Sequence, residues 1–104
     1  MAKSIKTPSK IWHAPAELTI SQARAVKDEL CEKLKLGASL DIDLSAVTEM
    51  DTAGIQLLLL ARREATQRQM TLRLLSPSPA VNDVVGLLQL DKYLGLVDAA
   101  PAAR

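Results

Sequence analysis

Segments with the pattern of β-strands alternate with segments of helical periodicity along this chain, and the connections between them are short. Strands are expected at residues 11–13, 40–44 and 71–75. Helices are expected over residues 23–34 and 54–69, and again from Pro77 onward. A chain with this order packs its helices against a mixed or parallel sheet. The sequence therefore predicts an α/β domain, and its 104 residues suffice for a single core.

The apolar side chains of these segments predict which faces are buried. In residues 40–44 the three apolar side chains point one way, which places Leu44 in the core. Asp41 and Asp43 point the other way and are expected to be solvated. In the predicted helix that follows, Leu58 is expected to face the same core.

The leucine run at residues 57–60 is too wide for one helix face. At 100° per residue it sweeps about 300° around the helix axis, more than one sheet can cover. Leu58 and Leu59 are the expected core pair, while Leu57 and Leu60 point toward the flanks or outward. Either neighbouring helices bury all four leucines, or an exposed one marks a contact surface.

Four small or polar residues, Asp51-Thr52-Ala53-Gly54, stand in front of the leucine helix. The side chain of Asp51 or of Thr52 can accept a hydrogen bond from the free amides of the first turn. Those amides and the helix dipole also favour negative charge, so they would tolerate a phosphate on Thr52, whereas Asp51 would repel it. Gly54 lets another backbone approach closely. Two interpretations stay open, a simple helix cap and a regulated docking site.

The residue types that catalysis and metal binding require are scarce. The chain has one histidine, His13, and one cysteine, Cys31, which is expected to be half-buried on a helix. It contains no serine in a nucleophile elbow, no glycine-rich phosphate loop and no histidine pair at metal-ligand spacing. We therefore expect no enzyme activity, no cofactor and no metal site.

Charge and hydropathy argue against nucleic acids and membranes as partners. Thirteen basic and twelve acidic residues give a net charge of +1, and only Trp12 and Tyr93 are aromatic. The longest apolar run, residues 57–61, is too short to span a bilayer. The basic residues near the N-terminus have no apolar stretch behind them, unlike a signal peptide. The expected location is cytoplasmic, without membrane insertion.

Three motifs together resemble the signature of STAS domains, the anti-sigma factor antagonist domains that also occur at the ends of sulfate transporters. They are Asp43-Leu44-Ser45-Ala46-Val47, then Met50-Asp51-Thr52-Ala53-Gly54-Ile55, then the leucine helix. The resemblance covers about residues 11–97 and includes a Glu17-Leu18-Thr19 turn and a Ser76-Pro77 helix start. It implies a STAS-like fold, with a four- to five-stranded mixed sheet and helices packed mainly on one side. The expected organisation is a flexible lead-in at residues 1–9, a STAS domain at 10–98 and a tail at 99–104.

The resemblance also implies where partners bind. In the antagonists, a partner-switching kinase phosphorylates a serine two positions after the aspartate, and that position is Ala53 here. Thr52 carries the only hydroxyl of the motif, so it is the candidate regulatory site and phosphoacceptor. The candidate partner-binding residues are Asp51, Thr52, Ala53, Gly54, Gln56 and Leu57.

Three functional hypotheses follow from this resemblance. The first is an anti-sigma factor antagonist or related signalling adaptor that binds an anti-sigma or histidine-kinase-like kinase, or a signalling complex. The second is the small STAS subunit of a lipid-trafficking ABC transporter, which binds and stabilises its ATPase; that group has Asp-Thr-Gly-Gly at this point. The third and weakest is a small-ligand-binding enzyme of unknown chemistry. The sequence leaves the oligomeric state open.

Overall fold

The computed structural model describes residues 10–35 and 39–97. The predicted lead-in at residues 1–9 and the tail at 99–104 lie outside the described residues.

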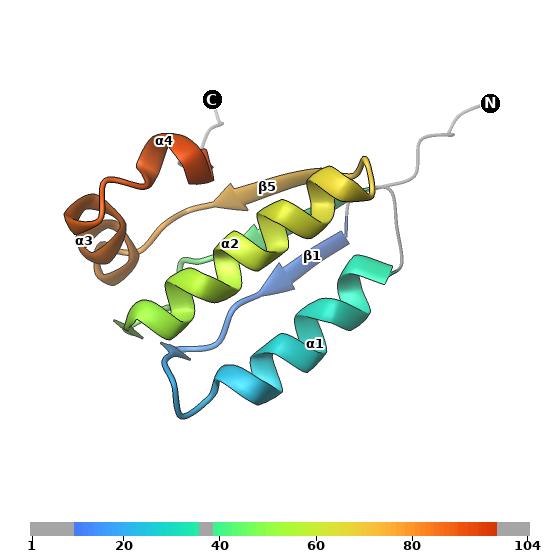
Figure 1. Cartoon of the computed structure of the whole chain (residues 1–104). Coiled ribbons are helices and arrows are strands. Elements are labelled where there is room, and N and C mark those ends of the chain that lie inside the picture. The colour runs from blue at the N-terminus through green and yellow to red at the C-terminus, as the bar shows by residue number, and fades with distance from the viewer. Residues whose placement is uncertain (1–9, 36–38, 98–104) are drawn as a thin grey trace.

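A parallel sheet forms the centre of the domain (Figure 1). Its strands, in the order β1-β3-β5-β6, are β1 (Lys10–His13), β3 (Ser39–Asp43), β5 (Thr71–Leu75) and β6 (Leu96–Val97). Two further strands, β2 (Glu17–Leu18) and β4 (Glu49–Met50), pair in a small separate parallel sheet. Every strand pair in the described part of the chain is parallel, which is one of the two arrangements that the alternation of segments allows. The predicted α/β class and a four-stranded main sheet are confirmed, but the described strands of that sheet are all parallel, whereas the resemblance implied a mixed sheet.

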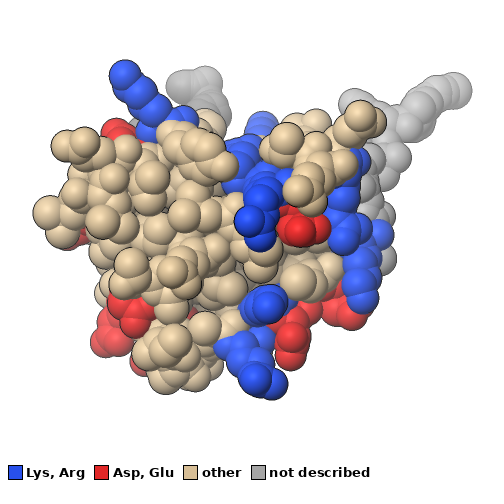
Figure 2. Space-filling model, viewed as in Figure 1, with Lys and Arg blue, Asp and Glu red and all other residues tan. Residues whose placement is uncertain are grey.

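Within the described residues, four helices accompany the sheets: α1 (Ala23–Lys35), α2 (Thr52–Gln67), α3 (Pro79–Leu87) and α4 (Asp91–Leu94). Helices α1 and α2 lie side by side over one face of the main sheet, and α3 and α4 follow on the other side of α2 (Figure 1). A serine–proline pair opens α3, but the helix begins at Pro79, two residues after the expected start at Pro77, because Ser78 is the cap and its side chain accepts a hydrogen bond from the amide of Val81. Figure 2 shows a largely uncharged area over the N-terminal half of α2, with basic side chains on its α1 side.

The core lies between the main sheet and these helices. Trp12, Ile42 and Leu74 stand opposite one another on neighbouring strands, and all three are buried. Leu44 and Leu58, the two predicted core residues, are 0% and 1% exposed, so this prediction is confirmed.

The leucine run faces the core through a different pair from the one expected. Leu57 is buried together with Leu58, whereas Leu59 and Leu60 are only partly buried. The prediction of a Leu58–Leu59 core pair is therefore wrong for Leu59. Helix α1 packs against α2, and Leu57 lies on the flank of α2 that faces Ala23 of α1. No leucine of the run is fully exposed.

A second prediction is wrong on the face of the main sheet opposite α1 and α2. Asp41 was expected to be solvated, but it is only 4% exposed. The parallel register places Arg73 of β5 directly opposite, and its guanidinium donates two hydrogen bonds of 2.9 and 2.7 Å to the Asp41 carboxylate. Asp43 remains half-buried. Hydrogen bonds from Ser45, followed by one from His13, hold the pKa of Asp43 below its usual range.

Candidate functional site

The carboxylate of Asp51 connects two segments that are far apart in the sequence. One oxygen, Oδ1, caps α2 by accepting hydrogen bonds from the amides of Ala53 at 2.9 Å and Gly54 at 3.4 Å. The other, Oδ2, accepts a hydrogen bond of 3.1 Å from the amide of Ile20, just before α1. Asp51 is thus the cap of α2, and it also holds the start of α1 next to the start of α2.

Thr52 occupies the first position of α2, and its side chain is exposed. Within residues 10–35 and 39–97, its hydroxyl makes no hydrogen bond. Of the two predicted cap candidates, only Asp51 serves as the cap. The hydroxyl of Thr52 therefore remains available at the helix end. The next residue, Ala53, is partly buried and offers no hydroxyl.

Gly54 is the point at which the first turn of α2 meets the backbone of β2. A Cβ atom at this position would collide with the carbonyl oxygen of Leu18 and lie 2.9 Å from the Leu18 Cβ and 3.1 Å from the Met50 Cγ. The predicted turn at residues 17–19 is in fact largely strand β2, which pairs with β4 and carries the buried Leu18. The close backbone approach expected at Gly54 is found, and the approaching backbone belongs to the chain itself.

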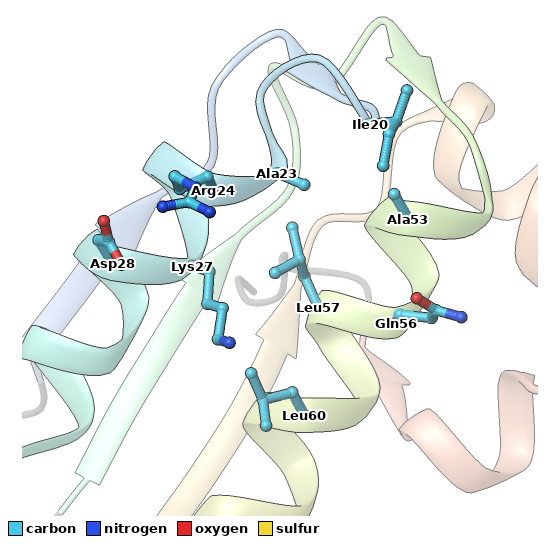
Figure 3. A pocket seen from close by; sticks show the side chains of 9 residues that line it. All are labelled: Ile20, Ala23, Arg24, Lys27, Asp28, Ala53, Gln56, Leu57 and Leu60. Carbon is cyan, nitrogen blue, oxygen red and sulfur yellow. The ribbon is translucent and has the colours of Figure 1, made fainter.

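A groove of about 510 Å³ runs between the N-terminal halves of α1 and α2 (Figure 3). Its apolar floor is formed by Ala23, Ala53, Leu57 and Leu60. Its rim carries Ile20, Arg24, Lys27, Asp28 and Gln56. In Figure 3, Lys27 from α1 and the two leucines from α2 point toward the space between the helices. The groove includes Ala53, the residue that follows Thr52, and can receive side chains from another molecule.

The six predicted binding residues divide into three groups. Ala53, Gln56 and Leu57 line the groove, whereas Thr52 is exposed directly before Ala53 and is not one of the lining residues. Asp51 and Gly54 instead serve the cap and the contact with β2.

The wall that α1 contributes was absent from the sequence prediction. An isoleucine just before a helix and two basic residues on that helix, at positions 20, 24 and 27, are the signal in the sequence. That signal becomes interpretable only when the packing of α1 against α2 is known.

Other chemically active side chains lie away from this groove. The ring Nδ1 of His13 is 2.9 Å from the Asp43 Oδ2 atom, at the carboxyl ends of β1 and β3. Cys31 is partly buried on α1, as expected. Across the described residues, no three histidine, cysteine, aspartate or glutamate side chains gather closely enough to hold a metal ion.

A family model described as "Mlab, STAS domain" matches residues 13–98. The chain belongs to the STAS domain family. A search of curated proteins found no match. No helix in the described part of this STAS domain is long and apolar enough to cross a membrane.

Solved structures share this fold at low sequence identity. The anti-sigma factor antagonist SpoIIAA in its unphosphorylated form is 21% identical with a TM-score of 0.72, over 94% of this chain and 86% of that one. A Thermotoga maritima protein described as an anti-sigma factor antagonist is 21% identical with a TM-score of 0.75, over 90% and 84%. An anti-sigma factor antagonist (STAS) domain protein from Planctomyces limnophilus is 20% identical with a TM-score of 0.73, over 86% and 81%. These likenesses confirm the STAS-like fold.

The cap geometry predicts different stability effects for two adjacent residues. Asp51→Ala should lower the free energy of unfolding by about 0.5–2 kcal/mol, because two amides of α2 lose their acceptor. Thr52→Ala should change it by less than about 0.5 kcal/mol, because the threonine side chain is exposed and makes no hydrogen bond to any residue that the structure describes. Urea unfolding followed by the fluorescence of Trp12, the single tryptophan, measures both. An equal loss in the two variants would contradict the assignment of the cap to Asp51.

Proposed function

We propose that this STAS domain is a non-catalytic regulatory protein-binding domain, a signalling adaptor of the anti-sigma factor antagonist kind, which docks through the Asp51–Gly54 end of α2. One observation carries the proposal. Thr52 is exposed at the first position of α2 and has no hydrogen-bond partner for its hydroxyl among residues 10–35 and 39–97, while the neighbouring Asp51 already supplies the cap. A hydroxyl that the fold does not use is free to contact a partner.

The surroundings of Thr52 suit a protein surface. Thr52 directly precedes Ala53, which lines a groove with an apolar floor, and the exposed Gln56 follows one turn later on α2. Apolar area beside a few polar groups is the usual composition of a protein–protein contact. The carboxylate of Asp51 lies next to Thr52, so a phosphate on Thr52 would place two negative groups side by side at the interface. This arrangement supports a protein–protein contact that becomes weaker when residue 52 carries a negative charge.

A second candidate function is a subunit that binds and stabilises the ATPase of a lipid-trafficking ABC transporter. The observation that favours it is Ala53, which lacks a hydroxyl at the position where the antagonists are phosphorylated. A site without the usual phosphoacceptor residue suits a partner that stays bound better than a partner whose binding is controlled by phosphorylation. Both candidates use the same end of α2, so the identity of the partner distinguishes them.

The test begins with affinity capture from the native cell, followed by identification and purification of the bound protein. A kinase or signalling protein supports the first candidate, and an ABC ATPase supports the second. Thr52→Glu should then weaken binding by about ten-fold or more in titration calorimetry, because an added charge beside Asp51 must be desolvated at the interface. Thr52→Ser keeps the hydroxyl and should leave the affinity within about two-fold.

The matched control places the same substitution at the other end of the same helix. Thr66 is exposed on the last turn of α2, so Thr66→Glu should leave the affinity unchanged. Unchanged affinity for Thr52→Glu, in a protein with a native circular dichroism spectrum, would refute docking through this end of α2.

A further inference from the structure

The α1 wall of the groove carries positive charge that the fold leaves unused. Arg24 and Lys27 are both exposed and line the groove (Figure 3). Neither takes part in an ion pair or hydrogen bond within the described residues, whereas Lys35, Arg68 and Arg73 are each paired with a carboxylate. Among the described residues that line the groove, Asp28 is the only acidic one.

The same groove exposes apolar surface at its mouth. Ile20 is 74% exposed, although the amide of this residue is fixed by Asp51. Leu57 and Leu60 lie across from it on α2 and form part of the floor. An exposed isoleucine beside an apolar floor forms a binding position for an apolar side chain. Arg24 and Lys27 lie next to this position.

We propose that this groove receives an acidic amphipathic segment of the partner protein. An apolar side chain of that segment packs between Ile20 and the two leucines on the floor, and neighbouring carboxylates pair with Arg24 and Lys27. This proposal rests on the proposed function, because two of the lining residues, Ala53 and Gln56, follow the exposed Thr52 by one position and by one turn on α2.

The chemistry of the groove favours a protein segment over other occupants. The floor is apolar, and the charged groups at the rim are all exposed side chains, so no buried polar group in the described residues is placed to orient a small polar ligand. Two cations beside one aspartate give too little charge for a nucleic acid, and no aromatic side chain lines the groove. A helix with one apolar face and one acidic face matches the apolar floor and the two basic residues of the groove.

A direct test uses a designed peptide as the probe. The peptide is a blocked helix of about 14 residues, or about four turns, with leucines at positions i, i+3, i+4 and i+7 and glutamates elsewhere. Its addition to the ¹⁵N-labelled domain should shift the amide signals of Ile20, Ala53 and Leu57. The matched control peptide replaces every glutamate with lysine and should bind about ten-fold more weakly or not at all. Equal binding of the two peptides, or shifts confined to other parts of the domain, would overturn the proposal.

A second test uses the purified partner from the capture experiment. The double variant Arg24→Glu/Lys27→Glu should weaken binding by about ten-fold or more, since two attractive pairs become repulsive. The affinity of the unmodified protein should fall as salt rises from about 50 to 500 mM, and that of the variant should not. Lys92→Glu on α4 is the control, because Lys92 is exposed, unpaired among the described residues and away from the groove, and binding should be retained.

The two proposals fail in different ways. If Thr52→Glu weakens partner binding while the double charge reversal does not, docking through α2 stands and the acidic segment is refuted. If the charge reversal weakens binding while Thr52→Glu has no effect, the groove is a binding site and the proposed role of Thr52 is refuted.

Discussion

Replacing Gly54 with alanine should cost about 3 kcal/mol or more in the free energy of unfolding, at the upper end of the overpacking range. Helix propensity alone would predict the opposite, a gain of about 1 kcal/mol in a helix interior. The added Cβ would meet the carbonyl oxygen of Leu18 and lie 2.9 Å from the Leu18 Cβ. That carbonyl accepts a hydrogen bond of 3.2 Å from the amide of Asp51, so it cannot withdraw without breaking the contact between β2 and the start of α2.

The control is the second helical glycine. An added Cβ at Gly86 in α3 would meet no atom within 4 Å, so Gly86→Ala should stabilise the protein by about 0.5–1 kcal/mol. Urea unfolding of both variants, followed by Trp12 fluorescence, gives the difference directly. A stable Gly54→Ala variant would show that β2 can move away from α2, and the proposed docking end of α2 would then be less firmly fixed than its contacts indicate.

The second large effect is expected in the core. Leu58→Ala and Leu44→Ala should each lower the free energy of unfolding by about 2–5 kcal/mol, the usual cost of an unfilled cavity. Both side chains are essentially inaccessible, and Leu58 belongs to the helix that lies across the sheet. A small domain has roughly 5–15 kcal/mol of stability in total, so either change removes a large part of it.

An exposed leucine provides the comparison for these core substitutions. Leu87 is 83% exposed at the end of α3, and Leu87→Ala should change the free energy of unfolding by less than about 0.5 kcal/mol. Urea melts of the three variants at equal protein concentration measure the contrast. Losses below about 1 kcal/mol at both Leu44 and Leu58 would contradict the packing of α2 on the sheet.

Most of the regular elements could be predicted from local patterns in the sequence. The strand at residues 71–75 was predicted with its observed bounds, and the helix α3 was predicted with a start at Pro77, two residues before the observed one. Such features depend on a few neighbouring residues, because alternation, helical periodicity and caps are local. The α2 helix begins two residues before the predicted start at Gly54, since the cap proved to be Asp51.

Features that depend on contacts between distant segments could not be predicted. Asp41 is buried because the strand register places Arg73 opposite, and register is not visible in either strand alone. Leu57 is buried because α1 lies beside α2. The dual role of Asp51 depends on Ile20, which precedes it by 31 residues. The part of the candidate site on α2 is predictable because its motif is continuous in the sequence. The α1 wall is not predictable, because the groove exists only once α1 packs against α2.

The shared carboxylate of Asp51 has a thermodynamic consequence for recognition. Because Oδ1 holds the first amides of α2 and Oδ2 holds the amide of Ile20, the backbones at both edges of the groove are ordered before any partner arrives. The conformational entropy needed to shape this surface is lost during folding, so association does not have to supply it. A partner therefore keeps more of its contact energy as affinity, and a flexible partner segment becomes ordered against a surface that is already rigid.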